Sequence, residues 1–520
     1  MSTKKLLSVL ILFAFTFVCG QSLPTEYSLS NNRAAKILDS SPASNTIERI
    51  LIQDGTIWLG TSKGLSKSTD NGNSWTNYYK SEAFEEESVS ALAYNNGTIW
   101  AATWHYETLL GEAAPVGTGL KYSTDNGETW HKIEQPVDDI NDTTIIYGIN
   151  TLRAQPIATQ AYNFVYDIEV TNTTIWLANY FGGPRKSTDN GITWQRVVLP
   201  PDNLDSIKPT DTLNFKWHPN FHLNQNTFSV LAVNDQEIYY GTAHGINKST
   251  DGGISWIKLN HSNQTNPITG NFVIAMDYNE FDNSIWASTW KTNNADEYWG
   301  VSRSQNGGES WEPFLTDERV LDFGFKYYGN PGNYVAADIF AASENGVFRS
   351  NNNGTTWIAA PDIYDLNTNI ALNTKHFRAV EVDQEESDIN IWIGSNNGLV
   401  LFNELSGFWD GAWKVYLASE AIASSSETYA FPNPFSPDEE VVNIKYSLGS
   451  ESKITIRIMD FGMNLVKTLI QNANRPMSES NIEIWDGRDE FGKIVPNGIY
   501  FYRIDFESGD PAFGKILVIM

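Results

Sequence analysis

The sequence predicts an all-β protein: a seven-bladed β-propeller over residues 45–418, followed by a small Ig-like β-sandwich over residues 429–520. Three observations support this prediction. A polar turn ending in tryptophan recurs along the chain, a strand-like segment precedes each copy, and the composition changes near residue 428. Repeats of about 50 residues, each with four strands, are typical of propeller blades.

The recurring turn contains Ser, Asp or Asn, and Gly before its tryptophan. Successive tryptophans lie between 46 (357 − 311) and 64 (194 − 130) residues apart. Four copies are close to one another and two are weaker: KSTDNGNSW (Lys67–Trp75), KYSTDNGETW (Lys121–Trp130), KSTDNGITW (Lys186–Trp194), KSTDGGISW (Lys248–Trp256), RSQNGGESW (ending at Trp311) and RSNNNGTTW (ending at Trp357).

The strand-like segment occurs seven times and combines β-branched with aromatic residues, a composition typical of strands. Another apolar segment precedes most copies, so each unit is expected to hold strands A to D, with the turn joining C to D. The seven copies are Thr56–Ser62, Thr98–Trp104, Thr174–Tyr180, Glu237–Ala243, Ser284–Trp290, Asp338–Glu344 and Asn390–Asn396.

The turn resembles the Asp box (BNR repeat) of sialidase-like and sortilin-like propellers, in which the box is structural. Its glycines suit a positive φ, and its carboxylates suit hydrogen bonds to turn N–H groups. The predicted structural positions are Asp70, Asp125, Asp189, Asp251, Asn306 and Asn352. Blade 7 (Leu401–Tyr416) lacks the box. Calcium is disfavoured because most turns carry a single carboxylate, so no metal and no cofactor are expected.

The N-terminus predicts a secretory signal peptide over residues 1–20. Lys4 and Lys5 precede an apolar run, Leu6–Val18, that is short for a membrane span. Cys19 suggests a lipid anchor as an alternative, although Val18 fits a lipid-attachment box poorly. Residues 21–44 form an N-terminal segment, and no later segment is apolar enough to span a membrane. We therefore expect a protein that is secreted or lies at the outer cell surface, reached through the periplasm.

The charge of the chain argues against two classes of partner. Its formal net charge is −27, and nucleic acids and anionic membrane faces both favour basic surfaces.

The C-terminal region follows a polar linker, residues 419–428, and alternates strands with Gly and Pro turns. It resembles the Ig-like domain of flagellar hook-capping proteins and, equally, the type A C-terminal sorting domain of type IX secretion. The shared elements are Pro432–Phe435, Trp485–Gly487, Gly492 and Gly498–Tyr502. The resemblance implies the type IX secretion machinery as a partner. The chain ends GKILVIM rather than on a basic residue, and the alternative is an Ig-like module without a sorting role.

The predicted binding surface is the face of the propeller opposite the boxes, which carries the B–C loops and the D–A connections. The longest insertions lie there, and loops on a rigid scaffold commonly carry function. Aromatic residues in these loops suit a glycan or a protein ligand, and the alternative is that they only pack their own loops. The candidate residues are Trp104, His105, Tyr106, Tyr180, Phe181, Trp217, Trp290, Tyr298 and Trp299.

The sequence gives weaker evidence for catalysis than for a binding surface. The sialidase Arg-Ile-Pro motif is absent, since Arg49-Ile50 is not followed by proline, and Arg303 and Arg349 fill a repeat position. His218 and His222 have metal-like spacing, but Pro219 disfavours the helix that would align them. The leading hypothesis is therefore a non-catalytic recognition propeller. The alternatives are a glycoside hydrolase on the same fold, in which two carboxylates act together, and an extracytoplasmic assembly or stability factor.

Overall fold

The structure is a computed structural model that describes residues 37–292, 296–368, 370–372, 374–384, 389–418, 428–437 and 441–520. The predicted signal peptide, Cys19 and most of the predicted linker lie outside these residues.

The described residues contain seven antiparallel β-sheets of the blade type, as the repeat predicts. Each has strands in the order A, B, C, D along the chain. The strands are β2 (Ile47–Gln53), β3 (Thr56–Thr61), β4 (Gly64–Ser68) and β5 (Trp75–Asn77) in blade 1; β6 (Ser88–Asn95), β7 (Thr98–Leu109), β8 (Glu112–Ser123) and β9 (His131–Ile133) in blade 2; β12 (Val165–Val170), β13 (Ile175–Asn179), β14 (Arg185–Ser187) and β15 (Gln195–Arg196) in blade 3; β18 (Thr227–Ala232), β19 (Ile238–Thr242), β20 (Gly245–Ser249) and β21 (Trp256–Leu259) in blade 4; β22 (Phe272–Asn279), β23 (Ser284–Trp290), β24 (Gly300–Ser304) and β25 (Glu312–Phe314) in blade 5; β26 (Val320–Asn330), β27 (Asn333–Ser343), β28 (Gly346–Ser350) and β29 (Ile358–Ala359) in blade 6; and β32 (Phe377–Asp383), β33 (Ile389–Ser395), β34 (Gly398–Gly407) and β35 (Asp410–Tyr416) in blade 7.

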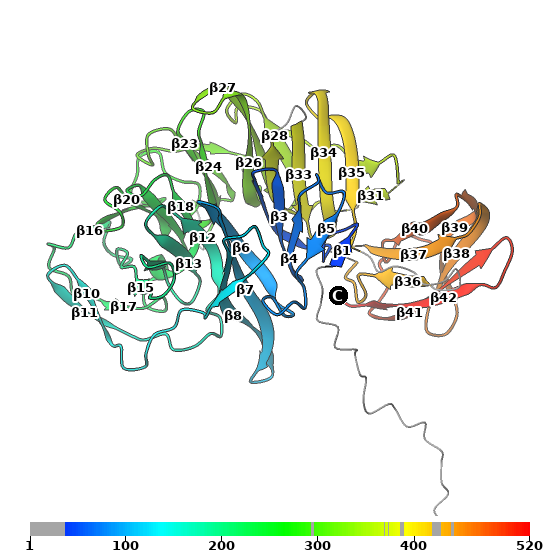
Figure 1. The fold of residues 1–520 in the computed structure, drawn as a ribbon, viewed down its shortest axis with the longest axis horizontal. Helices are drawn as coiled ribbons and strands as arrows, with labels where there is room; N and C mark the ends of the chain where they lie inside the picture. The colour runs from blue at the N-terminus through cyan, green and yellow to red at the C-terminus, as the bar shows by residue number, and fades with distance from the viewer. Residues whose placement is uncertain are drawn as a thin grey trace, which may run out of the picture. The chain divides into compact units, whose positions relative to one another are not determined.

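The blades close into a ring around a central channel. The A strand of each blade contacts the A strands of its two neighbours, and β2 of blade 1 contacts β32 of blade 7. Figure 1 shows the blue first blade beside the yellow last one. Asn45 joins the two ends of the ring, because its carbonyl accepts from Gly398 N (2.7 Å) and its side chain accepts from Ala418 N (2.6 Å). The fold is therefore a seven-bladed β-propeller.

The B–C loops and the D–A connections lie on the same face of the ring. Ser62, in the B–C loop of blade 1, donates its backbone N–H to Thr46 O (3.2 Å), just before strand A. Ala243 makes the same bond to Asn226 in blade 4 (3.0 Å). The B–C loops therefore lie at the end of the channel where the A strands begin, whereas all six boxes join C to D at the opposite face.

Each box is an internally bonded turn. In blade 2, Asp125 accepts from the Thr129 backbone N–H (2.8 Å) and hydroxyl (2.6 Å), and Ser123 Oγ accepts from Gly127 N (2.8 Å). The bonds from Thr129 hold the pKa of Asp125 below its usual range. Asn352 keeps the geometry in blade 6, accepting from Thr356 N (2.9 Å) while its amide donates to the Thr356 hydroxyl (2.8 Å).

The box tryptophans also connect neighbouring blades. Trp130 of blade 2 packs edge-on against Trp58 on strand B of blade 1, with ring centroids 6.1 Å apart. Trp357 repeats this contact with Trp286 (6.1 Å), and Trp75 repeats it with Trp392 of blade 7 (6.1 Å), across the closure. The boxes therefore recur because each serves an interface between blades.

Several elements were not predicted. β1 (Ile37–Asp39) adds an outer strand to blade 1. The blade 2 insertion, expected as a loop, continues β7 and β8 into a long hairpin that projects from the propeller (Figure 1). The connection from blade 2 to blade 3 forms a hairpin, β10 (Thr144–Tyr147) with β11 (Asn150–Ala154). The remaining short elements are β16 (Ser206–Ile207), β17 (Lys216–Trp217), the 3₁₀ turn η1 (Leu223–Gln225), β30 (Ile363–Asp365) and β31 (Ile370–Leu372).

The C-terminal region forms a separate hydrophobic core between two sheets. One sheet is β36 (Thr428–Phe431), β37 (Val442–Leu448) and β40 (Ser478–Trp485). The other is β39 (Leu465–Arg475), β38 (Ser452–Met459), β41 (Gly498–Phe506) and β42 (Ala512–Val518). Trp485 is fully buried in this core and donates its indole N–H to Arg488 O (2.9 Å). The two sheets match the expected sandwich, and its identification as Ig-like stays a prediction.

Candidate functional site

A row of contacting aromatic rings crosses the B–C face from blade 2 to blade 5. Tyr106 packs on Trp104 (centroids 4.8 Å apart), and Trp104 stacks on Phe164 (5.3 Å). Phe164 contacts Tyr166 (4.6 Å), which contacts Phe228 (5.2 Å). We call this group, with its continuation below, the aromatic row.

The row continues into blade 5. Phe228 contacts Phe272 (4.3 Å), and Phe272 stacks on Trp290 (6.4 Å). Tyr180 joins from the side against Phe228 (5.5 Å). Four of the candidate residues, Trp104, Tyr106, Tyr180 and Trp290, lie in the row, and their role in ligand binding stays a prediction. The row also contains four rings that were not candidates: Phe164, Tyr166, Phe228 and Phe272.

The four additional rings lie at or just before the first residues of the A strands, in segments that the sequence repeat assigns to the blade core. Tyr166 occupies a β-bulge, as the register of β12 with β13 shows, and Phe228 occupies the matching bulge in blade 4. Each bulge shifts the register by one residue, so simple alternation along the strand does not predict on which side these rings lie. Phe164 and Phe228 are buried, whereas Tyr166 and Phe272 are half-buried. The sequence did contain an indication of these rings, because an aromatic residue begins the apolar segment expected to form strand A, as at Phe164 and Phe228.

A positively charged corner ends the row at blade 5. The Arg319 guanidinium lies over Trp290 (5.5 Å) and over Trp299 (4.4 Å), and it pairs with Glu344 (3.0 Å). Lys291 lies over the other predicted ring, Trp299 (4.0 Å). Sugar rings and cations both bind aromatic faces. A sugar at this corner would therefore contact the faces of Trp290 and Trp299 that Arg319 does not cover.

The remaining candidate residues lie outside the row. Trp217 is fully buried and donates to Val197 O (3.2 Å), so it is a core residue and not a binding platform. Phe181 packs against His218 (5.8 Å) in the same core, His105 pairs with Glu107 (2.9 Å), and Tyr298 is half-buried, with its backbone bonded to Thr269 O (3.0 Å). Trp217 was misplaced because its long insertion folds back onto blade 3.

Carboxylates line the channel beneath the aromatic row. Asp167, Asp277, Asp322 and Glu381 lie on the A strands of blades 3, 5, 6 and 7. Asp167 raises the pKa of Asp277 and Asp322, and these two raise the pKa of Glu381. Blades that are not neighbours interact in this way only through the channel. The group is therefore a second feature at the centre of the propeller.

The level nearest the B–C face contains two of these carboxylates and one arginine. Arg49, Asp167 and Asp322 each follow the bulge in their own A strand. Asp167 accepts from Val230 N (2.9 Å) and Asp322 from Val380 N (3.0 Å), each on the next blade. Burial raises the pKa of both carboxyls to about 6, and the Arg49 charge limits that rise.

The carboxyls of the level below it have pKa values that are raised further. Glu169, Asp277 and Glu381 lie two residues further along their strands, toward the box face. Burial raises the pKa of Asp277 to about 8 and that of Glu381 to about 8, and it raises the pKa of Glu169 well above its usual range. The carboxyls of this level therefore keep their protons to a higher pH than those of the upper level.

Arg49 connects the two features. Its Nη2 donates to Tyr166 O in the aromatic row (3.4 Å), and its charge acts on Asp167 and Asp322. Within the described residues, no group of three or more His, Asp or Glu side chains is arranged to hold a metal ion. Over the same residues, no helix is long and apolar enough to cross a membrane.

Comparison with known protein families and sequences finds two similarities. The BNR/Asp-box repeat family matches residues 121–132. Xyloglucanase Xgh74A of Acetivibrio thermocellus is 25% identical over 259 residues, and the match covers 49% of this chain but only 24% of the relative. The matching region is thus about a quarter of that enzyme.

Solved structures support the fold. An ancestral GH74 enzyme superposes with a TM-score of 0.53 at 13% identity, covering 92% of this chain and 63% of that chain. The GH74 xyloglucanase of Xanthomonas campestris gives 0.50 at 12% identity, covering 79% and 59%. The similarity to xyloglucanases contradicts the expectation of a non-catalytic recognition propeller and favours the glycoside hydrolase that the sequence left as an alternative.

Proposed function

We propose that this protein is a glycoside hydrolase that binds a polysaccharide along the aromatic row and cleaves it at the channel mouth. The observation that carries the proposal is the position of Asp167 and Asp322 at the channel level nearest the B–C face, which also carries the aromatic row. Aromatic rings provide flat surfaces for sugar rings, and glycoside hydrolysis ordinarily uses a pair of carboxyls. The xyloglucanase relative supports xyloglucan as the substrate.

Asp167 and Asp322 are the proposed catalytic pair. With pKa values of about 6, both carboxyls titrate near neutral pH, and the charge of Asp167 opposes ionisation of Asp322. One can therefore carry the proton for the glycosidic oxygen while the other stays ionised as base or nucleophile. Arg49 is the proposed positioning residue, because its charge favours the ionised form of both.

The test is hydrolysis of xyloglucan and unbranched β-glucan by the wild type, Asp167→Asn and Asp322→Asn. Loss of a general acid or base typically slows catalysis by about 10²–10⁴-fold. The pH profile assigns the roles, because the variant lacking the base loses the acidic limb and the variant lacking the acid loses the alkaline limb.

Asp277→Asn is the matched control, since it changes a channel carboxyl one level deeper. It should retain activity within about twofold, because a sugar on the row does not reach it. If wild-type protein hydrolyses neither glucan, or if all three variants lose activity equally, the proposed site is incorrect.

We also propose that the protein is extracytoplasmic and that its C-terminal sandwich directs export through the type IX machinery. The support is the Pro432–Phe435 and Gly498–Tyr502 resemblance, now found on a domain with its own core. Deletion of residues 427–520 in a host with this pathway should leave folded propeller in the periplasm. Normal arrival of the truncated protein at the surface or in the medium would contradict this role.

A further inference from the structure

A groove lies between two strand edges at the outer side of blade 3. Its volume is about 320 Å³. One wall is formed by Trp194 and the D strand β15, and the other by the first three residues of β10, Thr144–Ile146. Figure 1 shows β10 and its hairpin partner β11 at the outer edge of the propeller. None of these residues belongs to the aromatic row or to the channel.

The edge of β15 that borders the groove has unpaired backbone groups. β15 pairs with β14 on one side, and no other strand of the described residues pairs with it. In an antiparallel pair, successive residues direct their N–H groups to opposite sides of the strand. Val197 N donates to Pro184 O at the end of this pair (2.9 Å), so the N–H of Arg196 points to the open side. Such an edge is a template for another strand.

Two other blades already pair this edge with a fifth strand. In blade 4, β16 pairs with β21, and Lys258 donates its N–H to Asp205 O (2.7 Å). Lys258 and Arg196 are each the second residue after their box tryptophan, so the open N–H of blade 3 matches the bonded one of blade 4. In blade 1, β1 pairs with β5 in the same way. Because β16 has only two residues, a short extended segment is enough to complete the edge.

Strand β10 forms the other wall of the groove without pairing with β15. Ala154 N donates to Thr143 O (2.7 Å), so by the same alternation the backbone groups of Thr144 and Ile146 point away from β11. The side chain of Ile146 is 71% exposed, and Trp194 on the opposite wall is half-buried. The groove therefore offers an open strand edge and an apolar side chain on each wall.

The charge of the groove is negative. Its lining contains three aspartates and two arginines, a net charge of 2 − 3 = −1. The side chains of Arg185 and Arg196 are nearly inaccessible, and both bond to the buried Asp138. The exposed charged side chains of the lining are Asp139 and Asp142, of which Asp142 also pairs with Arg196. A ligand in the groove therefore meets carboxylates rather than guanidinium groups.

We propose that blade 3 binds an extended peptide segment of a partner protein, which adds to β15 as a fifth strand. Strand addition draws affinity from main-chain hydrogen bonds and specificity from side-chain contacts. Successive side chains of a strand point to opposite sides. Apolar residues of the segment therefore pack on Ile146 and Trp194, and its lysine or arginine residues lie toward the two exposed aspartates. A second copy of the chain is a poorer occupant, because a net charge of −27 opposes self-association. The inference concerns another surface than the hydrolase proposal and does not depend on it.

The first experiment measures the binding of three labelled hexapeptides to the full chain by fluorescence anisotropy. The first peptide alternates lysine with valine, the second has glutamate in place of lysine, and the third is the lysine peptide with every backbone nitrogen methylated. The first should bind at least tenfold more tightly than either of the others. Equal binding of the glutamate peptide would show that charge is not recognised, and equal binding of the methylated peptide would show that no strand forms. Either result, or no binding of the lysine peptide, overturns the proposal.

The second experiment places a positive charge at the groove. Ile146→Lys should fold normally, because this side chain is mostly exposed, and should weaken binding of the lysine peptide at least tenfold. Ile149, on the same hairpin and 70% exposed, does not line the groove, so Ile149→Lys is the matched control with the same change in net charge. It should change the affinity by less than about twofold, with melting temperatures measured in parallel to confirm folding. Equal effects of the two variants would mean general electrostatic attraction and would contradict binding in the groove.

The third experiment tests the other occupant, a second copy of this chain. Sedimentation velocity of the wild type should show a monomer at the concentrations used for peptide binding. A dimer that Ile146→Lys dissociates and Ile149→Lys leaves intact would assign the open edges to self-association and overturn the proposal of a peptide partner.

Discussion

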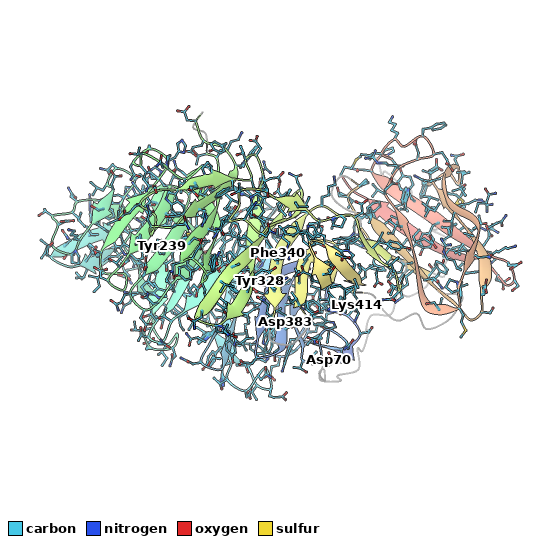
Figure 2. The ribbon with its side chains drawn as sticks, turned by 90° about the horizontal axis from the view of Figure 1, so that it is seen from above. Asp70, Tyr239, Tyr328, Phe340, Asp383 and Lys414 are labelled. Atoms are coloured by element: carbon cyan, nitrogen blue, oxygen red, sulfur yellow. The ribbon has the colours of Figure 1, made fainter. Side chains whose placement is uncertain are left out.

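Arg349 and Glu404 form a buried ion pair across the interface of blades 6 and 7, with Nη2 and Oε1 2.8 Å apart. Arg349 occupies the position before the box serine. Lys67 and Lys248, at this position in blades 1 and 4, donate instead to carbonyls of the next box, Asn126 O (2.6 Å) and Gly307 O (2.9 Å). Blade 7 has no box, and Glu404 supplies the acceptor that the box backbone supplies elsewhere. Arg349 also pairs with Asp338, which accepts from the Tyr328 hydroxyl (3.1 Å), and its guanidinium lies over the Phe340 ring (5.0 Å). Figure 2 labels Tyr328 and Phe340.

Glu404→Ala should therefore destabilise the propeller. Lys326 and Arg349 both bond to Glu404, and all three side chains are nearly inaccessible. Arg349 keeps its pair with Asp338 in this variant, whereas Lys326 is left buried without its carboxylate. Breaking a buried ion pair in this way costs about 3–5 kcal/mol. Urea unfolding should show this loss. The control is Glu312→Ala, an exposed carboxylate 3.5 Å from Arg303, which should cost under about 1 kcal/mol. Similar losses for both would mean that Glu404 does not serve as the interface acceptor.

The box glycines provide a second stability test with a control of equal backbone geometry. Gly127 and Gly97 both have φ of 80°. A Cβ on Gly127 would overlap the Tyr78 hydroxyl and come within 2.8 Å of the Trp58 ring, whereas a Cβ on Gly97 meets nothing within 4 Å.

Gly97→Ala should cost only the backbone term, about 1–2 kcal/mol. Gly127→Ala should cost about 1–3 kcal/mol more, because side chains of blade 1 must move. Thermal unfolding of the two variants gives the comparison directly. If both lose the same amount, the close approach between blades is not what requires glycine in the box.

The channel carboxyls make stability depend on pH. Asp277 and Glu381 have folded pKa values of about 8, raised first by burial, against unfolded values near 4. Between these values the folded state keeps protons that the unfolded state has released. Raising the pH from about 4 to about 8 therefore favours unfolding, and the loss is complete above the folded pKa. Asp167, Glu169 and Asp322 face the same channel and add to the effect, while Arg49 opposes it.

The melting temperature should accordingly fall as the pH rises from 5 to 8. A variant in which one channel carboxyl cannot ionise separates the contribution of that carboxyl from those of the other titrating groups. Asp277→Asn is that variant, since its amide cannot ionise and should flatten part of the slope. An identical pH dependence in the variant would show that Asp277 is already ionised in the folded protein.

The features that recur in every blade could be predicted from the sequence. The contacts that form only when the blades pack together in the ring could not. The box, the strand B aromatics and the blade count follow from local patterns, and Asn306 and Asn352 fit them because an amide can still accept from the turn. The pairing of Arg349 with Glu404 and the electrostatic effect of Asp167 on Asp322 both connect residues far apart in sequence. Trp217 shows the converse, because an aromatic residue in an insertion packs inward when that insertion has a core of its own.

The final prediction concerns Trp104, next to Tyr106 at one end of the aromatic row, and Trp290 at the other end. Neither is a box residue, and each is only half-buried, so replacing both with alanine should change the melting temperature little. Each ring contributes on the order of 1 kcal/mol of stacking to a bound sugar. The double variant should therefore raise KM for xyloglucan at least tenfold, since about 1.4 kcal/mol corresponds to a factor of ten. Its kcat should change less, because Asp167 and Asp322 are untouched. The comparison is Trp256→Ala, a buried box tryptophan, which should lower the free energy of unfolding by about 3 kcal/mol and leave KM of the folded fraction unchanged. If the double variant unfolds while the KM of its folded fraction stays at the wild-type value, the rings serve packing and the polysaccharide binds elsewhere.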